Sequence, residues 1–168
     1  MKCCMPILKI RPNPDDNLAE PSPFTVLGHN SPLSYRNAAR HLAEDFANST
    51  GFSPAPYESK ELDKYPEYRR DRALLFIEPI SLQRIRCFGA VGVRWKKYDD
   101  IPVAGWFMTW AWFHPSEQRK GHLKNAWPYI LKLFPDFIPD PPYSTAMKSF
   151  LRKIQFSHPH VPARCLFD

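Results

Sequence analysis

The chain has 168 residues, 43% of them hydrophobic, which is enough apolar material for one domain with a substantial core. No apolar run reaches the roughly 18 residues needed to span a bilayer, and the first residues lack the organisation of a signal peptide, so we expect a cytoplasmic protein without a membrane segment. A formal net charge of +6 favours an anionic partner, such as a nucleotide cofactor, an acidic protein or a nucleic acid.

The first third of the chain is predicted to be an extended segment followed by a helix. Residues 1–33 contain six prolines and allow only short extended pieces, one of which we expect to be an edge strand. From 35 to 49 the apolar residues fall on one helical face, and Ser34 is the predicted N-cap. Residues 58–71 are highly charged and predict a loose second helix.

The middle of the chain predicts three antiparallel strands joined by short turns, at 73–78, 84–95 and 104–113. The last of these contains no charged residue and is apolar on both faces. A strand with this pattern is typical of the centre of a sheet that helices cover on both sides. We therefore interpret its tryptophans as core residues.

A basic turn follows the central strand and leads into a helix predicted at 119–134. Pro128 is expected to bend that helix or to divide it into two. The turn contains Gly121, and the open backbone N–H groups of a helix start, together with the helix dipole, favour an anion. The turn is therefore a candidate anion-binding site.

The last part of the chain predicts a very short strand at 137–138 and a helix at 145–156 that Ser144 caps. Four cysteines occur without a C-x-x-C spacing and are expected to stay reduced: Cys3, Cys4, Cys87 and Cys165. His158 and His160 lie near Cys165 in the sequence, but no further ligand-type residue accompanies them, so we predict no metal site.

The turn also resembles a known motif. Pro115-x-x-Gln118-x-x-Gly121-x-Leu123 is similar to motif A of the GNAT superfamily of acyl-CoA-dependent N-acyltransferases. In that family the pattern Gln/Arg-x-x-Gly-x-Gly/Ala follows the central strand, and its backbone amides hold the CoA pyrophosphate. Leu123 departs from the pattern, because the family has glycine or alanine there.

The predicted order of elements over residues 34–156 is also similar to the GNAT order. The resemblance implies an α/β (α+β) fold with a mixed, mainly antiparallel central sheet and helices on both faces. We expect a single GNAT-like N-acetyltransferase domain over 1–168. Within it, 1–33 would be an extended Pro-rich N-terminal segment, and 157–168 would be a C-terminal tail.

The function that the resemblance implies is transfer of an acetyl group from acetyl-CoA to a primary amine. The acceptor would be a protein lysine, a protein N-terminus or a small amine. The residues expected to bind the cofactor are those of the strand end, the turn and the last helix start: Ala111, Trp112, Phe113, Gln118, Arg119, Lys120, Gly121, His122, Leu123 and Ser144.

The catalytic groups are less clearly indicated. Leu151 stands where the family often has a tyrosine that protonates the departing thiolate, and Tyr143 is the nearest substitute donor. The central strand has no carboxylate to act as general base. The remaining candidates for that role are His114, Glu117, Glu78 and Asp140, and the segment around the last is locally similar to an Asp-Pro segment of cohesin acetyltransferases.

Two other functions fit the sequence. One is a catalytically inactive GNAT-like module that binds CoA or another protein. The other is a nucleic-acid-binding domain that uses the positive charge, although no recognised nucleic-acid motif occurs. A homodimer also remains open.

Overall fold

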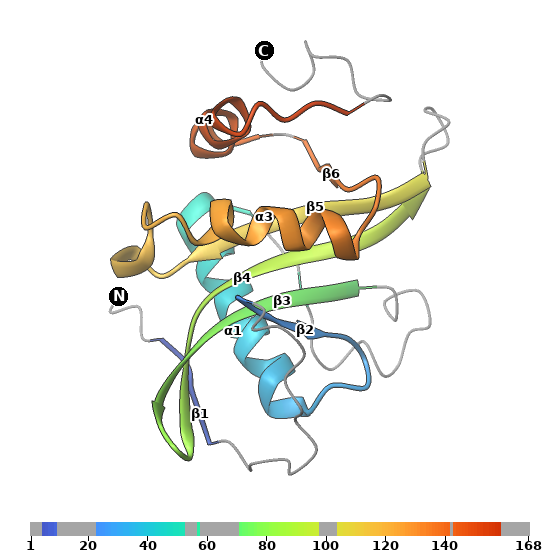
Figure 1. The fold of residues 1–168 in the computed structure, drawn as a ribbon. Coiled ribbons are helices and arrows are strands. Elements are labelled where there is room, and N and C mark those ends of the chain that lie inside the picture. Colours follow the sequence, from blue (N-terminus) through green and yellow to red (C-terminus); the bar gives the residue numbers. More distant parts are fainter. Residues whose placement is uncertain are drawn as a thin grey trace.

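A mixed sheet with helices on both faces forms the body of the molecule, as the sequence predicts (Figure 1). The computed structural model describes residues 5–9, 23–52, 57, 71–97, 104–141 and 143–158. Its elements in chain order are β1 (Ile7–Lys9), β2 (Thr25–Leu27), α1 (Leu33–Thr50), β3 (Asp71–Ser81), β4 (Arg84–Lys97), β5 (Ala104–Phe113), the 3-10 helix η2 (Pro115–Glu117), α3 (His122–Leu133), β6 (Ile138–Pro139) and α4 (Thr145–Lys153).

The three long strands form the predicted antiparallel meander. β3 pairs with β4 and β4 with β5, and the order across the sheet is β2-β3-β4-β5-β6. Among the described strands, β6 alone runs parallel to its neighbour, β5. Both short N-terminal pieces are strands. β2 lies at the edge beside β3, and β1 pairs with the first residues of β4.

One extra residue in β5 changes which helix each side chain faces. The pairing with β4 shifts between Gly92 and Val93, and Thr109 is the additional residue. Met108 packs in the cluster under α3, whereas Trp110 packs in the cluster under α1. In a regular strand, residues two apart share a face. The bulge therefore places the side chains of Met108 and Trp110 on opposite faces of the sheet.

Two glycines of β4 make room for aromatic residues of β5. Gly89 pairs with Phe113, and Gly92 pairs with Trp110. A Cβ atom at Gly89 would lie 2.3 Å from Phe113 Cδ1, and one at Gly92 would lie 1.9 Å from Trp110 Nε1. Each ring therefore rests against glycine backbone, and a larger residue at either position would displace it.

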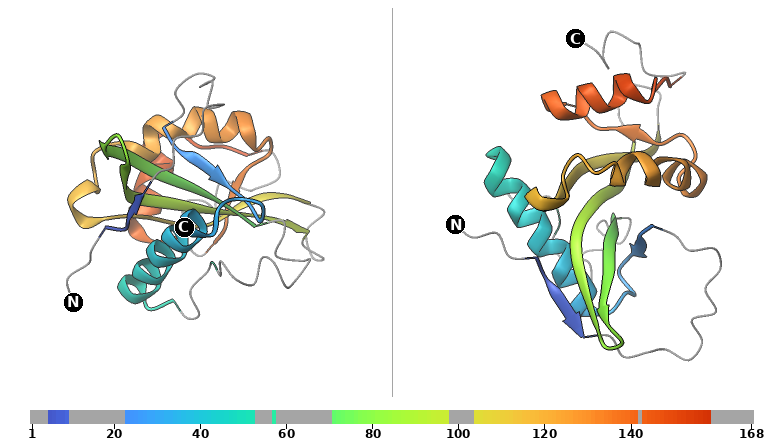
Figure 2. Two further views of the ribbon diagram at one scale, coloured as in Figure 1. Left: turned by 90° about the horizontal axis from the view of Figure 1, so that it is seen from below. Right: turned by 60° about the vertical axis from the view of Figure 1, so that its left-hand side comes forward.

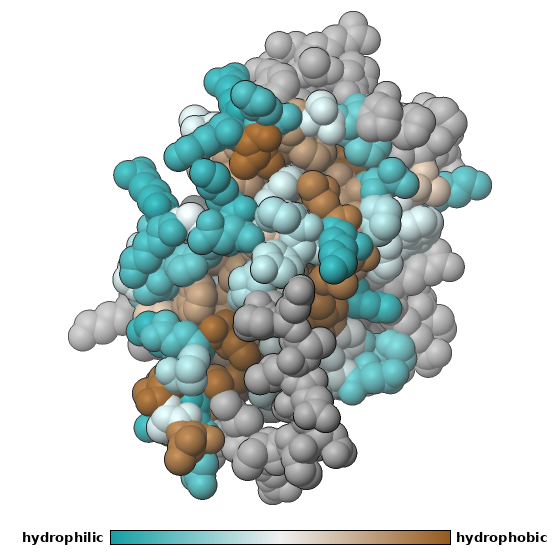
Figure 3. Space-filling view, viewed as in Figure 1, coloured by the Kyte–Doolittle hydropathy of each residue, from teal (hydrophilic) through white to brown (hydrophobic). Residues whose placement is uncertain are grey.

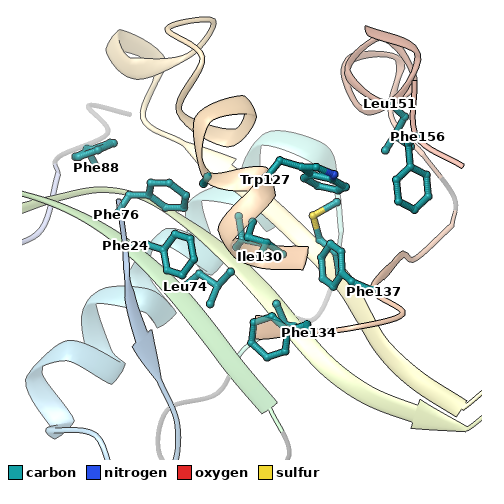
Figure 4. Packing of buried hydrophobic residues seen from close by; sticks show 14 residues of the cluster. Phe24, Leu74, Phe76, Phe88, Trp127, Ile130, Phe134, Phe137, Leu151 and Phe156 are labelled. Carbon is teal, nitrogen blue, oxygen red and sulfur yellow. The ribbon is translucent and has the colours of Figure 1, made fainter. Parts of the chain in front are cut away.

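Helices lie on both faces of the sheet (Figure 2). Each face carries its own hydrophobic cluster under a helix. α1 covers one face through buried residues such as Ala39 and Leu42. α3 covers the other through Trp127 and Ile130, and Leu151 of α4 closes the same cluster (Figure 4). Burying an aliphatic or aromatic side chain of this size contributes about 1.5–3 kcal/mol. β5 is thus covered on both sides, as its sequence predicts.

The ends of α1 and α4 agree with the sequence in part. α1 begins after Pro32, which is its N-cap, so the predicted cap Ser34 lies inside the first turn. α4 has the predicted cap, since Ser144 Oγ accepts from the N–H of Met147 at 3.2 Å. It ends earlier than predicted, at Lys153, shortly before the left-handed residue Gln155.

The proline in α3 does not divide the helix into two. Pro128 removes one backbone donor, but Trp127 and Ile130 are buried against the sheet and hold the helix across that gap. The helix starts at His122 rather than at residue 119, because Arg119 and Gly121 both have positive φ angles.

Some predictions fall outside the described ranges. These are the second helix predicted at 58–71 and the tail beyond residue 158. Of the residues in that predicted helix, the structure describes Asp71, which is the first residue of β3.

Cys87 is buried with a free thiol. The described helices include none long and apolar enough to cross a membrane. In the same part of the chain, no three His, Cys, Asp or Glu side chains are placed to hold a metal.

Candidate functional site

The central strand, β5, has a free edge beyond the point where its parallel neighbour, β6, stops pairing with it. β6 pairs with β5 at only two positions, ending at Met108 opposite Pro139, and the N–H of Asp140 then donates to the C=O of Met108 at 2.9 Å. We call this point the β5–β6 junction. Beyond it, the described residues place no strand beside residues 109–113 on this side. That stretch is called the free edge of β5 below.

The backbone groups on the free edge belong to alternate residues. The N–H of His114 donates to the C=O of Phe88 on β4 at 2.8 Å. Because the direction alternates along a strand, Ala111 and Phe113 direct their N–H and C=O groups to the opposite side. The C=O of Phe113 accepts from Gln118 Nε2 at 3.0 Å. The free edge therefore offers the N–H and C=O of Ala111 and the N–H of Phe113.

The free edge leads directly into an open helix start. Arg119 (φ 63°) and Gly121 (φ 85°) are both in the left-handed region. Alternation of handedness in a turn points successive N–H groups to one side and forms a concave anion site. The first N–H groups of a helix have no intrahelical acceptor. Because α3 also begins without a side-chain cap, these groups lack a side-chain acceptor at the N-cap as well. Hydrophilic residues gather over this turn on the surface (Figure 3).

Leu123 does not block the helix start, although it departs from the resemblance noted above. Its side chain packs against the hydrophobic cluster under α3. The bulk of the leucine is therefore absorbed by the core, and the backbone N–H groups of the first turn stay open.

Glu117 links the two basic side chains that follow it. Its carboxylate lies 3.0 Å from Lys120 Nζ and 3.1 Å from His122 Nε2, and only 11% of its side chain is exposed. The hydrogen bond from Lys120, assisted by the one from His122, lowers the pKa of Glu117 against the opposing effect of burial. The carboxylate is therefore ionised, and it holds the two basic side chains beside it.

The β5–β6 junction carries two of the predicted catalytic side chains. Asp140 forms an ion pair with Lys96 of β4, and its carboxyl side chain is 14% exposed. β5 lies between the two strands, and the register partner of Lys96 on β5 is Gly105. The hydroxyl of Tyr143 donates to the C=O of Pro139 at 2.9 Å. The phenol and the carboxylate thus both lie where β6 leaves β5.

The other residues predicted for the site have structural contacts of their own. His114 caps η2, because its Nδ1 accepts from the N–H of Ser116 at 3.2 Å. A proton at that nitrogen would break the cap. Glu78 forms an ion pair with Arg86 near the β3–β4 hairpin. The hydroxyl of Ser144 caps α4, and Trp112 is buried in the cluster under α1, so its contribution to the free edge is structural.

Sequence reasoning did not find Lys96. It is 44 residues from Asp140, and the pair forms only because β4, β5 and β6 are adjacent in the sheet. A lysine just before a polar turn is also unremarkable in a sequence.

No protein-family model matches this sequence, and no curated protein sequence matches it either. The fold, by contrast, is GNAT-like, a mixed and mostly antiparallel sheet with helices, and solved structures of acetyltransferases share it.

Individual solved structures share this fold at low sequence identity. Ribosomal-protein-alanine N-acetyltransferase from Brucella melitensis biovar Abortus 2308 has a TM-score of 0.55 and 11% identity, over 83% of this chain and 94% of that one. An aminoglycoside acetyltransferase from an uncultured soil metagenomic sample has a TM-score of 0.54 and 12% identity, over 79% and 84%. An acetyltransferase from Trypanosoma brucei has a TM-score of 0.50 and 15% identity, over 84% and 97%.

Proposed function

We propose that this protein is an acetyl-CoA-dependent N-acetyltransferase that acts on a primary amine. The observation that carries the proposal is the continuity of the free edge of β5 with the uncapped start of α3, within a GNAT fold. An extended chain with amide groups can pair with the edge while its diphosphate end meets the open N–H groups. Acyl-CoA has this combination of groups.

The residues that would hold acetyl-CoA act mainly through their backbones. Ala111 and Phe113 offer groups to the amides of the CoA arm, and the turn of Gln118 to Gly121 faces the diphosphate. Arg119 adds an exposed positive charge, whereas Lys120 already has Glu117 as its partner. Acetyl-CoA, when bound, supplies an acetyl group already activated as a thioester.

Two side chains at the β5–β6 junction are suited to the proton transfers. Amide formation requires a proton to leave the amine and another to reach the departing thiolate. Asp140 would accept the first, and Lys96 fixes the position of its carboxylate. Tyr143 would donate the second, because its hydroxyl is held at the junction by Pro139. His114 is the weaker candidate, since its Nδ1 already serves as a cap.

The acceptor is assigned only as a primary amine. The two similar enzymes whose names state a substrate differ widely, since one is named for ribosomal-protein alanine and the other for aminoglycosides. The fold therefore accommodates both protein and small-molecule acceptors.

A CoA-binding module without catalysis is the second candidate function, and Leu151 is the observation that favours it. This residue is fully buried in the core, and it has no proton to give. β5 also lacks a carboxylate along its whole length. Such a module would retain the turn and the free edge and lose turnover.

Two measurements on the purified full-length protein test the proposal. The first is calorimetric titration with acetyl-CoA, for which we expect one site of micromolar affinity. The second is release of CoA thiol in the presence of a panel of peptide N-termini, lysine peptides, polyamines and aminoglycosides. Absence of binding would overturn both candidate functions, whereas binding without turnover on any acceptor would favour the inactive module.

Asp140→Asn and Lys96→Met separate the role of the junction from that of the cofactor site. Both variants should bind acetyl-CoA with unchanged affinity, because neither residue belongs to the turn. The asparagine variant should lose about 10²-fold or more in turnover, the range for removal of a general base. Normal turnover in Asp140→Asn would exclude the carboxylate as the base.

A further inference from the structure

A pocket of about 320 Å³ lies between the C-terminal half of α3 and the residues that follow α4. Three segments line it: Trp127 and Leu131 of α3, Asp136 and Phe137 before β6, and residues 154–158. Leu131 is nine residues beyond the start of α3, which is about 14 Å along the helix axis. At ~30 Å³ for each water, the volume equals that of roughly ten water molecules. The pocket therefore has room for a small organic molecule, away from the turn that precedes α3.

Aromatic rings from all three segments form the inner wall of the pocket. Trp127, Phe137 and Phe156 are each less than a tenth exposed. The rings of Phe137 and Phe156 meet the indole of Trp127 edge-on, at centroid distances of 5.5 and 5.8 Å. The indole nitrogen of Trp127 lies on the side of Phe156 (Figure 4). A wall of this kind fits an apolar body, and aromatic rings also attract a cation through their electron-rich faces.

The charge at the pocket is negative, although the protein as a whole carries +6. Of the nine described residues that line the pocket, Asp136 is acidic and none is a lysine or an arginine. The side chain of Asp136 is exposed, and within the described ranges no hydrogen bond or ion pair occupies its carboxylate. The carboxylate beside the aromatic wall therefore favours a positively charged ligand.

The backbone at the pocket is held in place on both sides. Asp136 (φ 58°) and Gln155 (φ 52°) are both in the left-handed region. The C=O of Asp136 lies so close to Gly105 of β5 that a Cβ atom there would be 3.3 Å away. At the end of α4, the N–H of Phe156 donates to the C=O of Leu151 at 3.0 Å, which fixes the turn that contains Gln155. The pocket is therefore formed before any ligand arrives, as is usual for small-molecule sites.

We propose that this pocket binds a small organic cation that has an apolar body. The ammonium group would lie against the carboxylate of Asp136, and the apolar body would pack on the wall around Trp127. The inference is independent of the proposed function, because no residue of the pocket belongs to the turn, to the free edge of β5 or to the β5–β6 junction.

The test is an NMR titration of the ¹⁵N-labelled full-length protein at low ionic strength, where charge pairing is least screened. The reporter is the indole N–H signal of Trp127, which Trp127→Phe identifies among the five tryptophans. The probe is benzyltrimethylammonium, whose quaternary nitrogen has no N–H and so cannot accept an acetyl group. We expect a dissociation constant of about 1 mM or below. The neutral 2-phenylethanol and the anionic phenylacetate should bind at least tenfold more weakly.

Two variants test the role of the carboxylate. Asp136→Asn keeps the shape of the side chain, and asparagine also adopts the left-handed conformation, so the fold should be preserved. Its affinity for the cation should fall at least tenfold. Asp140→Asn is the matched control, because it removes the same charge at the β5–β6 junction. Its affinity for the cation should be unchanged.

Several results would overturn the inference. These are an unmoved Trp127 signal with the cation at up to about 20 mM, equal affinity for the three probes, or unchanged affinity in Asp136→Asn. A loss of affinity in Asp140→Asn alone would place the cation at the β5–β6 junction and would overturn it too. Asp136→Asn should bind acetyl-CoA like the natural protein, so a failure of acetyl-CoA binding would affect the proposed function and leave the cation pocket standing.

Discussion

Gly121 allows the cofactor site to be tested apart from folding, because the chain contains a second glycine in the same conformation. Gly121 (φ 85°) precedes α3, and Gly51 (φ 75°) follows α1. At both positions an added Cβ would meet no atom within 4 Å. Replacement by a residue with a side chain therefore costs only the left-handed backbone strain, about 1–2 kcal/mol. For a chain of this size that lowers the melting temperature by roughly 2–8 °C.

Glutamate at the two positions should differ in its effect on folding and in its effect on binding. At position 121 the carboxylate lies at the start of a helix, where the dipole favours it by about 0.3–1 kcal/mol, and at position 51 it lies at a helix end, where the dipole opposes it. Gly51→Glu should therefore be the less stable variant. Against a phosphate charge at ~5 Å, with an effective dielectric constant of ~20, Gly121→Glu adds a repulsion of about 3 kcal/mol before salt screening.

We expect Gly121→Glu to bind acetyl-CoA at least tenfold more weakly than the natural protein, and Gly51→Glu to bind it normally. Calorimetric titration in 0.15 M salt measures the affinities, and thermal unfolding measures the cost to stability. Affinities of both variants for acetyl-CoA equal to that of the natural protein would refute the assignment of the turn as the diphosphate site. Equal losses of affinity would instead attribute the effect to folding.

Three further results are expected. Tyr143→Phe should lower turnover by about 10²-fold or more with unchanged acetyl-CoA affinity, because it removes the hydroxyl held at Pro139 and little packing; unchanged turnover would exclude Tyr143 as the acid. Gly92→Ala should destabilise the fold by about 1–3 kcal/mol in urea unfolding, because its Cβ would overlap Trp110, and an unaffected midpoint would contradict the packing. Burial raises the pKa of Cys87 to about 12, so its thiol should resist iodoacetamide at pH 8 until the protein unfolds. The raised pKa of Cys87 stabilises the folded protein fully at pH values below the pKa of the thiol in the unfolded chain. This stabilisation is lost as the pH rises from there toward 12. Peptide mapping of labelled native protein would reveal a reactive Cys87 if this were wrong.

The sequence predicts the central part of the fold well because local pattern and burial agree there. β5 is apolar on both faces and proves to be the covered central strand, and the three meander strands follow from short apolar runs separated by polar turns. The bulge at Thr109 could not be predicted, because it depends on how β5 registers against Gly92 of β4. The continuity of α3 across Pro128 likewise depends on tertiary burial, which a local helix rule does not contain.

The site divides in the same way between local and long-range features. The turn from Gln118 to Gly121 is a local motif that leads into the predicted helix, and the anion site there stays a prediction. The partners of its charged groups are set by three-dimensional proximity. The ion pair of Asp140 with Lys96 spans three strands, and the bond of Tyr143 to Pro139 depends on where β6 stops. Neither contact produces a periodic pattern in the sequence, so a local reading of the sequence does not predict it.

Leu151 by itself does not decide between an enzyme and an inactive module. Holding a thioester and an amine in reacting geometry can supply about 7–11 kcal/mol of the barrier reduction, whereas a positioned proton donor contributes typically 10²–10⁴-fold, or about 3–5 kcal/mol. The larger contribution depends on the backbone of the free edge of β5 and of the turn, whereas Leu151 is a side chain buried in the core. Its presence therefore removes at most the smaller contribution, and Tyr143 at the β5–β6 junction is placed to restore it. A double variant settles the point. If Tyr143→Phe combined with Asp140→Asn still turns over well above the uncatalysed rate, positioning alone drives the reaction. If the double variant binds acetyl-CoA but is inactive, the junction supplies the essential proton transfers.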